Sequence, residues 1–146
     1  MATVCATVAQ CAEAVIPSVL KEIKETEKGD IYSPSQALPE MGGQDGPGNR
    51  LVISIDLGNS THVDVNDTPR CFSFWVEHER NLARNWYFVM PNLCIDGSAG
   101  VKVQLFHGCM IVWDGCVIRH NTSKTLVGPG NHVYGIFFCG YKGRGT

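Results

Sequence analysis

The sequence predicts a mainly β domain that is preceded by a helical segment. Residues 1–49 combine a helical spacing of apolar side chains with a loop-like stretch, whereas residues 50–146 consist of short β-branched and aromatic runs separated by turn residues. The chain has 146 residues, of which 44% are hydrophobic and 18% charged, as expected for one globular domain. We therefore expect a single domain with an N-terminal helical segment and loop (1–49) and a β core (50–146).

The N-terminal segment carries apolar residues at spacings of three and four, as on one face of a helix. This stripe runs through Val15, Val19 and Ile23, and charged residues gather after it in KEIKETEKGD. Pro17 should break or kink the helix, because proline lacks a backbone N–H and clashes with the preceding turn. Residues 28–49 are rich in glycine, proline and polar side chains, which predicts a loop.

The β core begins at Arg50, where the character of the sequence changes. Its strand-like runs are LVISIDL, CFSFWVE, NWYFVM, VKVQLF, CMIVWD, CVIRH and HVYGIFFCGY. Turn residues separate these runs and no helical pattern lies between them, which predicts an antiparallel sandwich or barrel. Large aromatic residues such as Trp75 and Trp113 are expected to fill its core.

Composition excludes some classes of partner. The net charge of −2 gives no overall attraction to a phosphate backbone or an anionic membrane. Contacts with nucleic acid would depend on local basic residues, and the candidates are Arg70, Arg80, Arg84, Lys142 and Arg144. The seven cysteines are scattered and form no CxxC pair, which predicts buried reduced thiols and an intracellular protein. No signal peptide or membrane-spanning stretch is expected.

A candidate metal site lies in the polar stretch STHVDVND, directly after the first apolar run. His62 and Asp64 stand at positions i and i+2, so on an extended segment their side chains point to the same face. Two histidines and one carboxylate form the ligand set of non-haem Fe(II) oxygenases, with open positions for substrate and oxygen. His120, at the end of CVIRH, is the candidate for the second histidine. The alternative is a polar surface turn without a metal.

The segments HVD, HGCMIVWDGCVIRH and GNHVYGIFF together resemble the Fe(II)/2-oxoglutarate dioxygenase superfamily, over roughly residues 50–141. Within it the likeness is greatest to the TET/JBP-like branch, which oxidises 5-methylcytosine. The HxDxxD form is similar to that of an algal member that uses ascorbate. The resemblance implies a double-stranded β-helix, which is a jelly-roll, cupin-like fold. It also implies Fe(II) held by His62, Asp64 and His120, oxidation of a methyl group in DNA, and an intracellular, nuclear location.

The resemblance extends to the co-substrate. Asp67 would lie beside it, although NDTP is also a good turn or capping sequence. The superfamily usually places Arg or Lys at the start of its last strand, to pair with the far carboxylate of 2-oxoglutarate. Here that position holds His132, and a neutral imidazole binds an anion only weakly. Arg119 is a substitute cation, and both 2-oxoglutarate and ascorbate are candidate co-substrates.

Two further readings remain open from the sequence. A non-catalytic β-barrel binding module would carry the histidines incidentally or for a structural metal. An oxygenase of the same fold could instead act on protein or on a small molecule. The superfamily usually backs its sheets with more N-terminal helix than this sequence contains, which leaves room for an additional subunit or a further N-terminal region.

Overall fold

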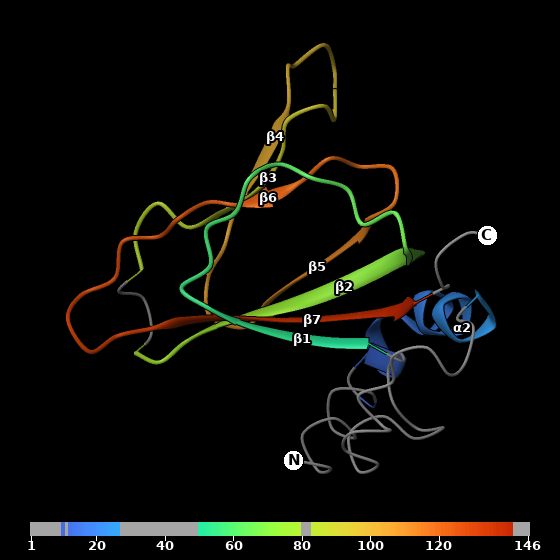
Figure 1. The fold of residues 1–146 in the computed structure, drawn as a ribbon, viewed down its shortest axis with the longest axis horizontal. Helices are drawn as coiled ribbons and strands as arrows, with labels where there is room; N and C mark the ends of the chain where they lie inside the picture. The colour runs from blue at the N-terminus through green and yellow to red at the C-terminus, as the bar shows by residue number, and fades with distance from the viewer. Residues whose placement is uncertain (1–9, 11, 27–49, 80–82, 142–146) are drawn as a thin grey trace.

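The computed structural model describes residues 10, 12–26, 50–79 and 83–141. Within these ranges the protein is mainly β, with two antiparallel sheets and a helical segment (Figure 1). The strands are β1 (Arg50–Ile55), β2 (Asp67–Glu77), β3 (Tyr87–Met90), β4 (Val101–Gln104), β5 (Cys109–Asp114), β6 (Asn121–Thr122) and β7 (Val133–Tyr141), and helix α2 spans Pro17–Thr26. The predicted class, mainly β with an N-terminal helix, is confirmed. Among these residues, no helix is long and apolar enough to cross a bilayer.

The larger sheet has the strand order β1-β7-β2-β5, and the smaller sheet has the order β4-β3-β6. The last strand, β7, lies between β1 and β2 and pairs antiparallel with both. Its residue Phe137 is opposite Val52 of β1 on one side and Ser73 of β2 on the other. Figure 1 shows the smaller sheet standing over the larger one, with the segment between β1 and β2 passing beside it.

One face of β2 packs toward the smaller sheet. Side chains alternate along a strand, so Cys71, Ser73 and Trp75 point to this face. The Trp75 ring lies 5.5 Å from the Phe88 ring of β3, measured between centroids. These two aromatic residues belong to one buried cluster that joins both sheets. The expectation that Trp75 fills the core is therefore confirmed, and the space beside this cluster holds the candidate site.

The opposite face of β2 packs against the helical segment. Phe72 points to this side and stacks on Phe138 of β7, with ring centroids 5.1 Å apart. Leu20 and Ile23 of α2 are buried against these rings. Burial of apolar surface contributes about 25 cal/mol per Å², so this contact attaches the helix firmly to the sheet. The helix thus covers the outer face of the larger sheet and leaves the inner face to the site.

The helical segment is interrupted at the predicted place. Residues 12–15 are helical, Ile16 is not, and α2 begins at Pro17. Proline suits the first position of a helix and disfavours the helical conformation of the residue before it. The interruption shifts the apolar stripe, so Ile23 is buried while Val15 is 66% exposed. The predicted stripe is therefore wrong at Val15, and the loop expected at 28–49 lies outside the described residues.

One predicted strand is wrong. The run CVIRH begins in a turn at residues 115–117 and contains no strand beyond the isolated bridge at His120, and the short strand β6 begins only after it. The cause is Asp114, whose carboxylate accepts a hydrogen bond from the Cys116 N–H at 3.1 Å and whose carbonyl accepts one from Ile118 N–H at 2.9 Å. A local aspartate turn of this kind competes with strand pairing. The other six runs each contain a strand, although β2 begins at Asp67, before the predicted run.

Candidate metal centre

His62 lies outside the regular strands, in the segment that connects β1 to β2. It forms an isolated antiparallel bridge with His120. The His62 N–H donates to the His120 carbonyl at 3.0 Å, and the His120 N–H donates to the His62 carbonyl at 2.9 Å. The two rings consequently lie next to each other, with centroids 4.6 Å apart. The backbone alone therefore brings together two histidines that are distant in sequence.

Both imidazoles are fixed in the same tautomer. His62 Nδ1 lies 2.9 Å from the Ser60 carbonyl oxygen, and His120 Nδ1 lies 2.8 Å from the Ile118 carbonyl oxygen. A carbonyl oxygen only accepts, so each Nδ1 must carry the hydrogen and donate it. In a neutral ring this leaves the lone pair on Nε2. Metal-binding histidines commonly show this arrangement, in which a backbone carbonyl orients the ring and fixes its tautomer.

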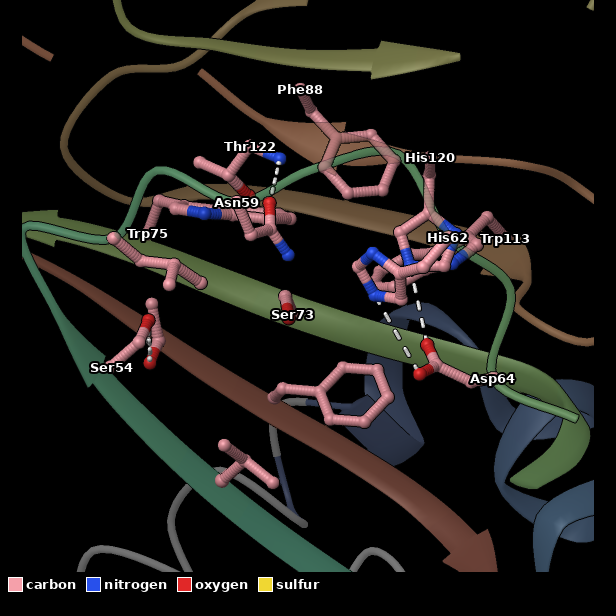
Figure 2. Close-up of a pocket in the computed structure, with 14 residues that line it drawn as sticks. Ser54, Asn59, His62, Asp64, Ser73, Trp75, Phe88, Trp113, His120 and Thr122 are labelled. Atoms are coloured by element: carbon pink, nitrogen blue, oxygen red, sulfur yellow. Dashed lines mark hydrogen bonds and ion pairs between the residues drawn. The ribbon is translucent and has the colours of Figure 1, made fainter. Parts of the chain in front are cut away.

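The Asp64 carboxylate faces both Nε2 atoms (Figure 2). Its Oδ1 lies 3.7 Å from His62 Nε2, and its Oδ2 lies 3.2 Å from His120 Nε2. One ligand atom from each of the three residues lies within 4.8 Å of the others. The structure thus brings together the three residues that the sequence singled out, and the i, i+2 spacing of His62 and Asp64 places both on one side as expected.

The donor set fits a divalent transition metal. Such ions hold imidazole nitrogen and carboxylate oxygen at about 2.0–2.2 Å, which places neighbouring donor atoms about 3 Å apart. The separations of 3.2 and 3.7 Å between the Asp64 oxygens and the two Nε2 atoms are close to this spacing, and the three donor atoms all lie within 4.8 Å of one another. Two neutral imidazoles with one carboxylate are the ligand set typical of non-haem Fe(II). Within the described part of the chain, this is the group of metal-binding side chains whose donor atoms converge.

Asp64 is held by the turn that follows β5. The Asp64 backbone N–H donates to the Gly115 carbonyl at 2.8 Å. Three residues after Asp64, the carbonyl of Asp67 accepts a hydrogen bond from the Cys116 thiol of the same turn, at 2.9 Å. Gly115 allows this close approach, because a Cβ there would lie 2.9 Å from Cys71 Sγ and 3.5 Å from Asp64 Oδ2. The turn that replaces the predicted strand therefore holds the backbone of Asp64, the residue that supplies the carboxylate of the site.

The cluster has a buried side and an open side. The His120 side chain is 5% exposed, and its ring stacks on Phe88 at 5.4 Å and meets the edge of Trp113 at 5.2 Å. The His62 side chain is 38% exposed. The three ligands therefore present one accessible face.

Burial raises the pKa of the neighbouring Cys71 thiol, with Asp67 and Asp64 adding to the effect, so this cysteine stays protonated.

A cavity of about 180 Å³ opens beside the cluster, between the larger sheet and the segment that carries His62 (Figure 2). Its lining residues are Val52, Ser54, Leu57, Asn59, His62, Asp64, Ser73, Trp75, Phe88, Trp113, His120, Thr122, Gly135 and Phe137. The volume lies below the range of about 300–1,000 Å³ that is usual for drug-sized ligands. A small molecule that reaches the metal position is therefore the expected occupant.

The wall of the cavity is mainly apolar, with a few polar groups and no cationic lysine or arginine among the described residues. Among the same residues, its one carboxylate belongs to Asp64. Besides the imidazoles of His62 and His120, its polar groups are hydroxyl, amide and indole groups, which belong to Ser54, Asn59, Ser73, Trp75, Trp113 and Thr122. Trp113 Nε1 is fully buried and has no hydrogen-bond partner among the described residues. A buried indole N–H normally has an acceptor, so this donor is an unsatisfied group within the core beside the cavity.

The residues that the resemblance assigns to the co-substrate are not gathered around the cavity. Asp67 is 1% exposed at the start of β2 and does not line the cavity. His132 precedes β7, as predicted, but its Nδ1 donates to Asp56 Oδ2 at 2.7 Å. Arg119 is exposed and also lies outside the lining. None of these three residues therefore lines the cavity, whose wall is built from other residues.

Comparison with known proteins adds no relative. No protein-family model matches the chain, and no curated protein matches it. The function proposed below therefore depends on the geometry of the cluster and on the resemblance of the motifs.

The cavity wall contains functional candidates that the sequence did not indicate. Asn59 and Ser73 are examples, since both line the cavity next to the cluster. Ser73 is a polar residue between the two phenylalanines of the run CFSFWVE, and it falls on the same strand face as Trp75. That pattern was an available signal for a polar group on an inner face. Asn59 had no such signal, because asparagine in a loop is ordinarily a turn residue.

Proposed function

We propose that this protein is a non-haem Fe(II)-dependent dioxygenase that oxidises a C–H group. The observation that carries the proposal is the arrangement of His62 and His120. Each ring donates its Nδ1 hydrogen to a backbone carbonyl, and both Nε2 atoms face the Asp64 carboxylate at the edge of a small cavity. A surface turn has no need to fix two tautomers in this way.

We further propose that the two sheets form a double-stranded β-helix. The antiparallel pairing and the position of the cluster at the space between the sheets support this architecture. In such a fold the ligands come from neighbouring segments at one end of the sheets. The bridge between His62 and His120 provides that neighbourhood here.

Each residue of the cluster has a defined task in this proposal. His62, Asp64 and His120 would hold Fe(II), which when bound supplies the activation of oxygen for C–H oxidation. Asp64 offers the negative charge of the site, and the carbonyls of Ser60 and Ile118 keep the imidazoles oriented. Phe88 and Trp113 cover His120 and exclude water from its side of the centre. The open face near His62 leaves room for a substrate to approach.

The substrate that we propose is the methyl group of 5-methylcytosine in DNA, on the strength of the motif resemblance. 2-Oxoglutarate or ascorbate would serve as the co-substrate. Of the basic residues that could contact phosphate, Arg84 is exposed. Arg70 is also exposed, but its Nε lies 3.3 Å from Glu22 Oε2. Arg80, Lys142 and Arg144 lie outside the described residues. A base in duplex DNA would have to leave the stack to reach a cavity of this kind.

Anaerobic titration of the purified protein with Fe(II), followed by calorimetry, tests the metal centre. We expect one Fe(II) per chain, and we expect binding to be lost in His62→Ala and in His120→Ala. His78→Ala is the matched control, because His78 is exposed and its ring lies against the Gly130 carbonyl, at 3.4 Å, outside the cluster. Undiminished binding in both site variants would rule out this centre.

Activity on methylated DNA then separates the proposed function from its alternatives. The loaded protein would be incubated with a 5-methylcytosine duplex and each co-substrate, and the nucleosides would be analysed by mass spectrometry. Loss of 5-methylcytosine with appearance of an oxidised or further modified base supports the proposal. Metal binding without any base change points to an oxygenase for protein or small molecules, or to a binding module with a structural metal.

A further inference from the structure

The end of the cavity away from the metal ligands is lined by neutral polar side chains. Ser73 is 3% exposed, lines the cavity and makes no side-chain hydrogen bond to any described residue. Trp75 is 4% exposed, and its indole nitrogen is likewise without a partner in the described part of the chain. Figure 2 shows Ser54, Ser73 and Asn59 facing one space, across from Asp64. Two polar groups that line one cavity without a partner among the described residues are available to hydrogen-bond a ligand there.

The amide of Asn59 has a fixed orientation. The side-chain Oδ1 accepts the Thr122 backbone N–H at 2.7 Å, and the backbone N–H of Asn59 donates to the Thr122 carbonyl at 3.1 Å. A backbone N–H needs an acceptor, so the side-chain oxygen must face Thr122 and the NH₂ group must face the cavity, as Figure 2 shows. Asn59 therefore offers hydrogen-bond donors to an occupant.

Ser54 offers the complementary group. Its hydroxyl donates to the Gly135 carbonyl at 3.4 Å, which leaves the oxygen lone pairs for an incoming donor. The absence of a side chain at Gly135 makes room here, because a Cβ would lie 2.8 Å from Ser54 Oγ and 3.4 Å from Trp75 Nε1. The donor on Asn59 and the acceptor on Ser54 thus belong to one small space.

This combination suits a hydroxyl group better than a carboxylate. A hydroxyl both donates and accepts, whereas an ionised carboxylate only accepts and would meet the lone pairs of Ser54. Burial of a carboxylate without a cation is also unfavourable, and none of the described residues that line the cavity is lysine or arginine. Asp64 adds further negative charge to the same cavity.

We infer that Ser54, Asn59, Ser73 and Trp75 form a subsite for the uncharged, hydroxylated end of a small ligand, whose anionic end is directed at His62, Asp64 and His120. The inference rests on the proposed function, because the metal centre defines the other end of the ligand. It assigns the selection of the co-substrate to neutral hydrogen bonds. His132 and Arg119, which the sequence offered as co-substrate contacts, have no part in it.

The experiment measures ligand binding to protein loaded with Co(II), a redox-quiet substitute for Fe(II), by calorimetry. The probes are 2-oxoglutarate, which has a charged far end, ascorbate, which has a diol far end, and 6-deoxyascorbate, which lacks one hydroxyl of that diol. We expect ascorbate to bind at least about tenfold more tightly than both other probes, since a site that hydrogen-bonds a hydroxyl discriminates against ligands without it. Tighter binding of 2-oxoglutarate, or equal binding of ascorbate and 6-deoxyascorbate, would overturn the inference.

Two variants sharpen the test. Ser73→Ala should weaken ascorbate by about tenfold without changing Co(II) affinity, while Ser98→Ala, at an exposed loop hydroxyl that bonds only Ile95, should change neither. Ser54→Arg adds the absent cation at the edge strand and should reverse the preference toward 2-oxoglutarate. If Ser73→Ala binds ascorbate like the parent protein, the subsite is wrong. Failure of Co(II) to bind at all would instead remove the proposed function, so the two failures are distinguishable.

Discussion

His62 and His120 are oriented by the same contact made twice. Each imidazole donates its Nδ1 hydrogen to the carbonyl of the residue two positions earlier, Ser60 in one case and Ile118 in the other, at 2.9 and 2.8 Å. The backbone bridge between the two histidines then points both rings at Asp64. The ligand atoms are thus positioned by the protein itself, and a metal would bind without rotation of the rings.

A preformed centre should couple metal binding to stability. A ligand that binds only the folded state raises the unfolding free energy by about 2.7 kcal/mol when its free concentration is a hundred times its Kd. We expect Zn(II) or Co(II) to raise the urea midpoint of the parent protein, and EDTA to reverse the effect. The same titration of His62→Ala should show no shift. An equal shift in that variant would place the metal elsewhere.

Gly58 should be essential to the segment that carries Asn59 and His62. A Cβ at Gly58 would lie 2.7 Å from Cα and Cβ of Lys124 and 2.9 Å from its backbone nitrogen. Backbone atoms cannot move aside cheaply, so Gly58→Ala should cost about 1–3 kcal/mol of stability. The substitution should also weaken metal binding, because a displacement at Gly58 would shift the connecting segment that carries His62.

The matched control for that substitution is Gly128→Ala. A Cβ at Gly128 meets nothing within 4 Å. Chemical denaturation should therefore separate the two alanine variants clearly. Similar unfolding midpoints would mean that the segment tolerates displacement and that its position is not fixed by Lys124.

Trp113→Phe should be tolerated better than Trp86→Phe in the same core. The loss of ring volume destabilises the core, but the change also removes a buried N–H that has no partner among the described residues. Trp86 is 2% exposed in the same core cluster, and its indole nitrogen is not one of these unpartnered buried atoms. In urea denaturation of the metal-free protein we expect a smaller loss for Trp113→Phe than for Trp86→Phe. The reverse order would show that the Trp113 N–H is satisfied in solution.

Asp56 should contribute stability that depends on pH. The hydrogen bond from His132, followed by that from the Val133 N–H, holds the pKa of the Asp56 carboxyl below its usual value. A carboxyl with a lowered folded-state pKa stabilises the protein above the unfolded-state value of 3.8, and this stability disappears as the pH falls through the folded-state pKa. The side chains are partly exposed, so the effect should be well under about 1 kcal/mol.

Comparison of Asp56→Asn with the parent protein at pH 7 and pH 3 checks this. The difference in urea midpoint should be present at pH 7 and should narrow at pH 3. Asp96→Asn, at an exposed loop residue with a similar positive φ, serves as the control and should give no such difference. A gap for Asp56→Asn that is constant with pH would mean that the charge of Asp56 is not responsible.

The sequence predicted the parts of the molecule that follow local rules. The helix break at Pro17 and six of the strand runs come from backbone chemistry and side-chain alternation. The i, i+2 spacing of His62 and Asp64 places them on one side for the same reason. His120 could be selected because the ligand set required a second histidine after an apolar run. Whether a metal binds these residues stays a prediction.

Other features depended on contacts that no local pattern contains. The run CVIRH has strong strand character, but a turn forms at its start because the Asp114 carboxylate accepts a hydrogen bond from the Cys116 backbone N–H. The side-chain NH₂ group of Asn59 faces the cavity because the side-chain oxygen accepts a hydrogen bond from the Thr122 backbone N–H. His132 stands at the expected place before the last strand, but its ring is engaged by Asp56, which is distant in sequence. Such pairings appear only when the chain has folded.

The central place of β7 has a consequence for how the protein forms. β1 and β2 are made early on the ribosome, but each needs β7 as its neighbour in the larger sheet. Until residues 133–141 have emerged, the edges of the two earlier strands remain open to pairing with other chains. A nascent chain halted before Val133 would therefore carry both site histidines and yet lack the sheet that shelters them, and it should be a substrate for chaperones and proteases.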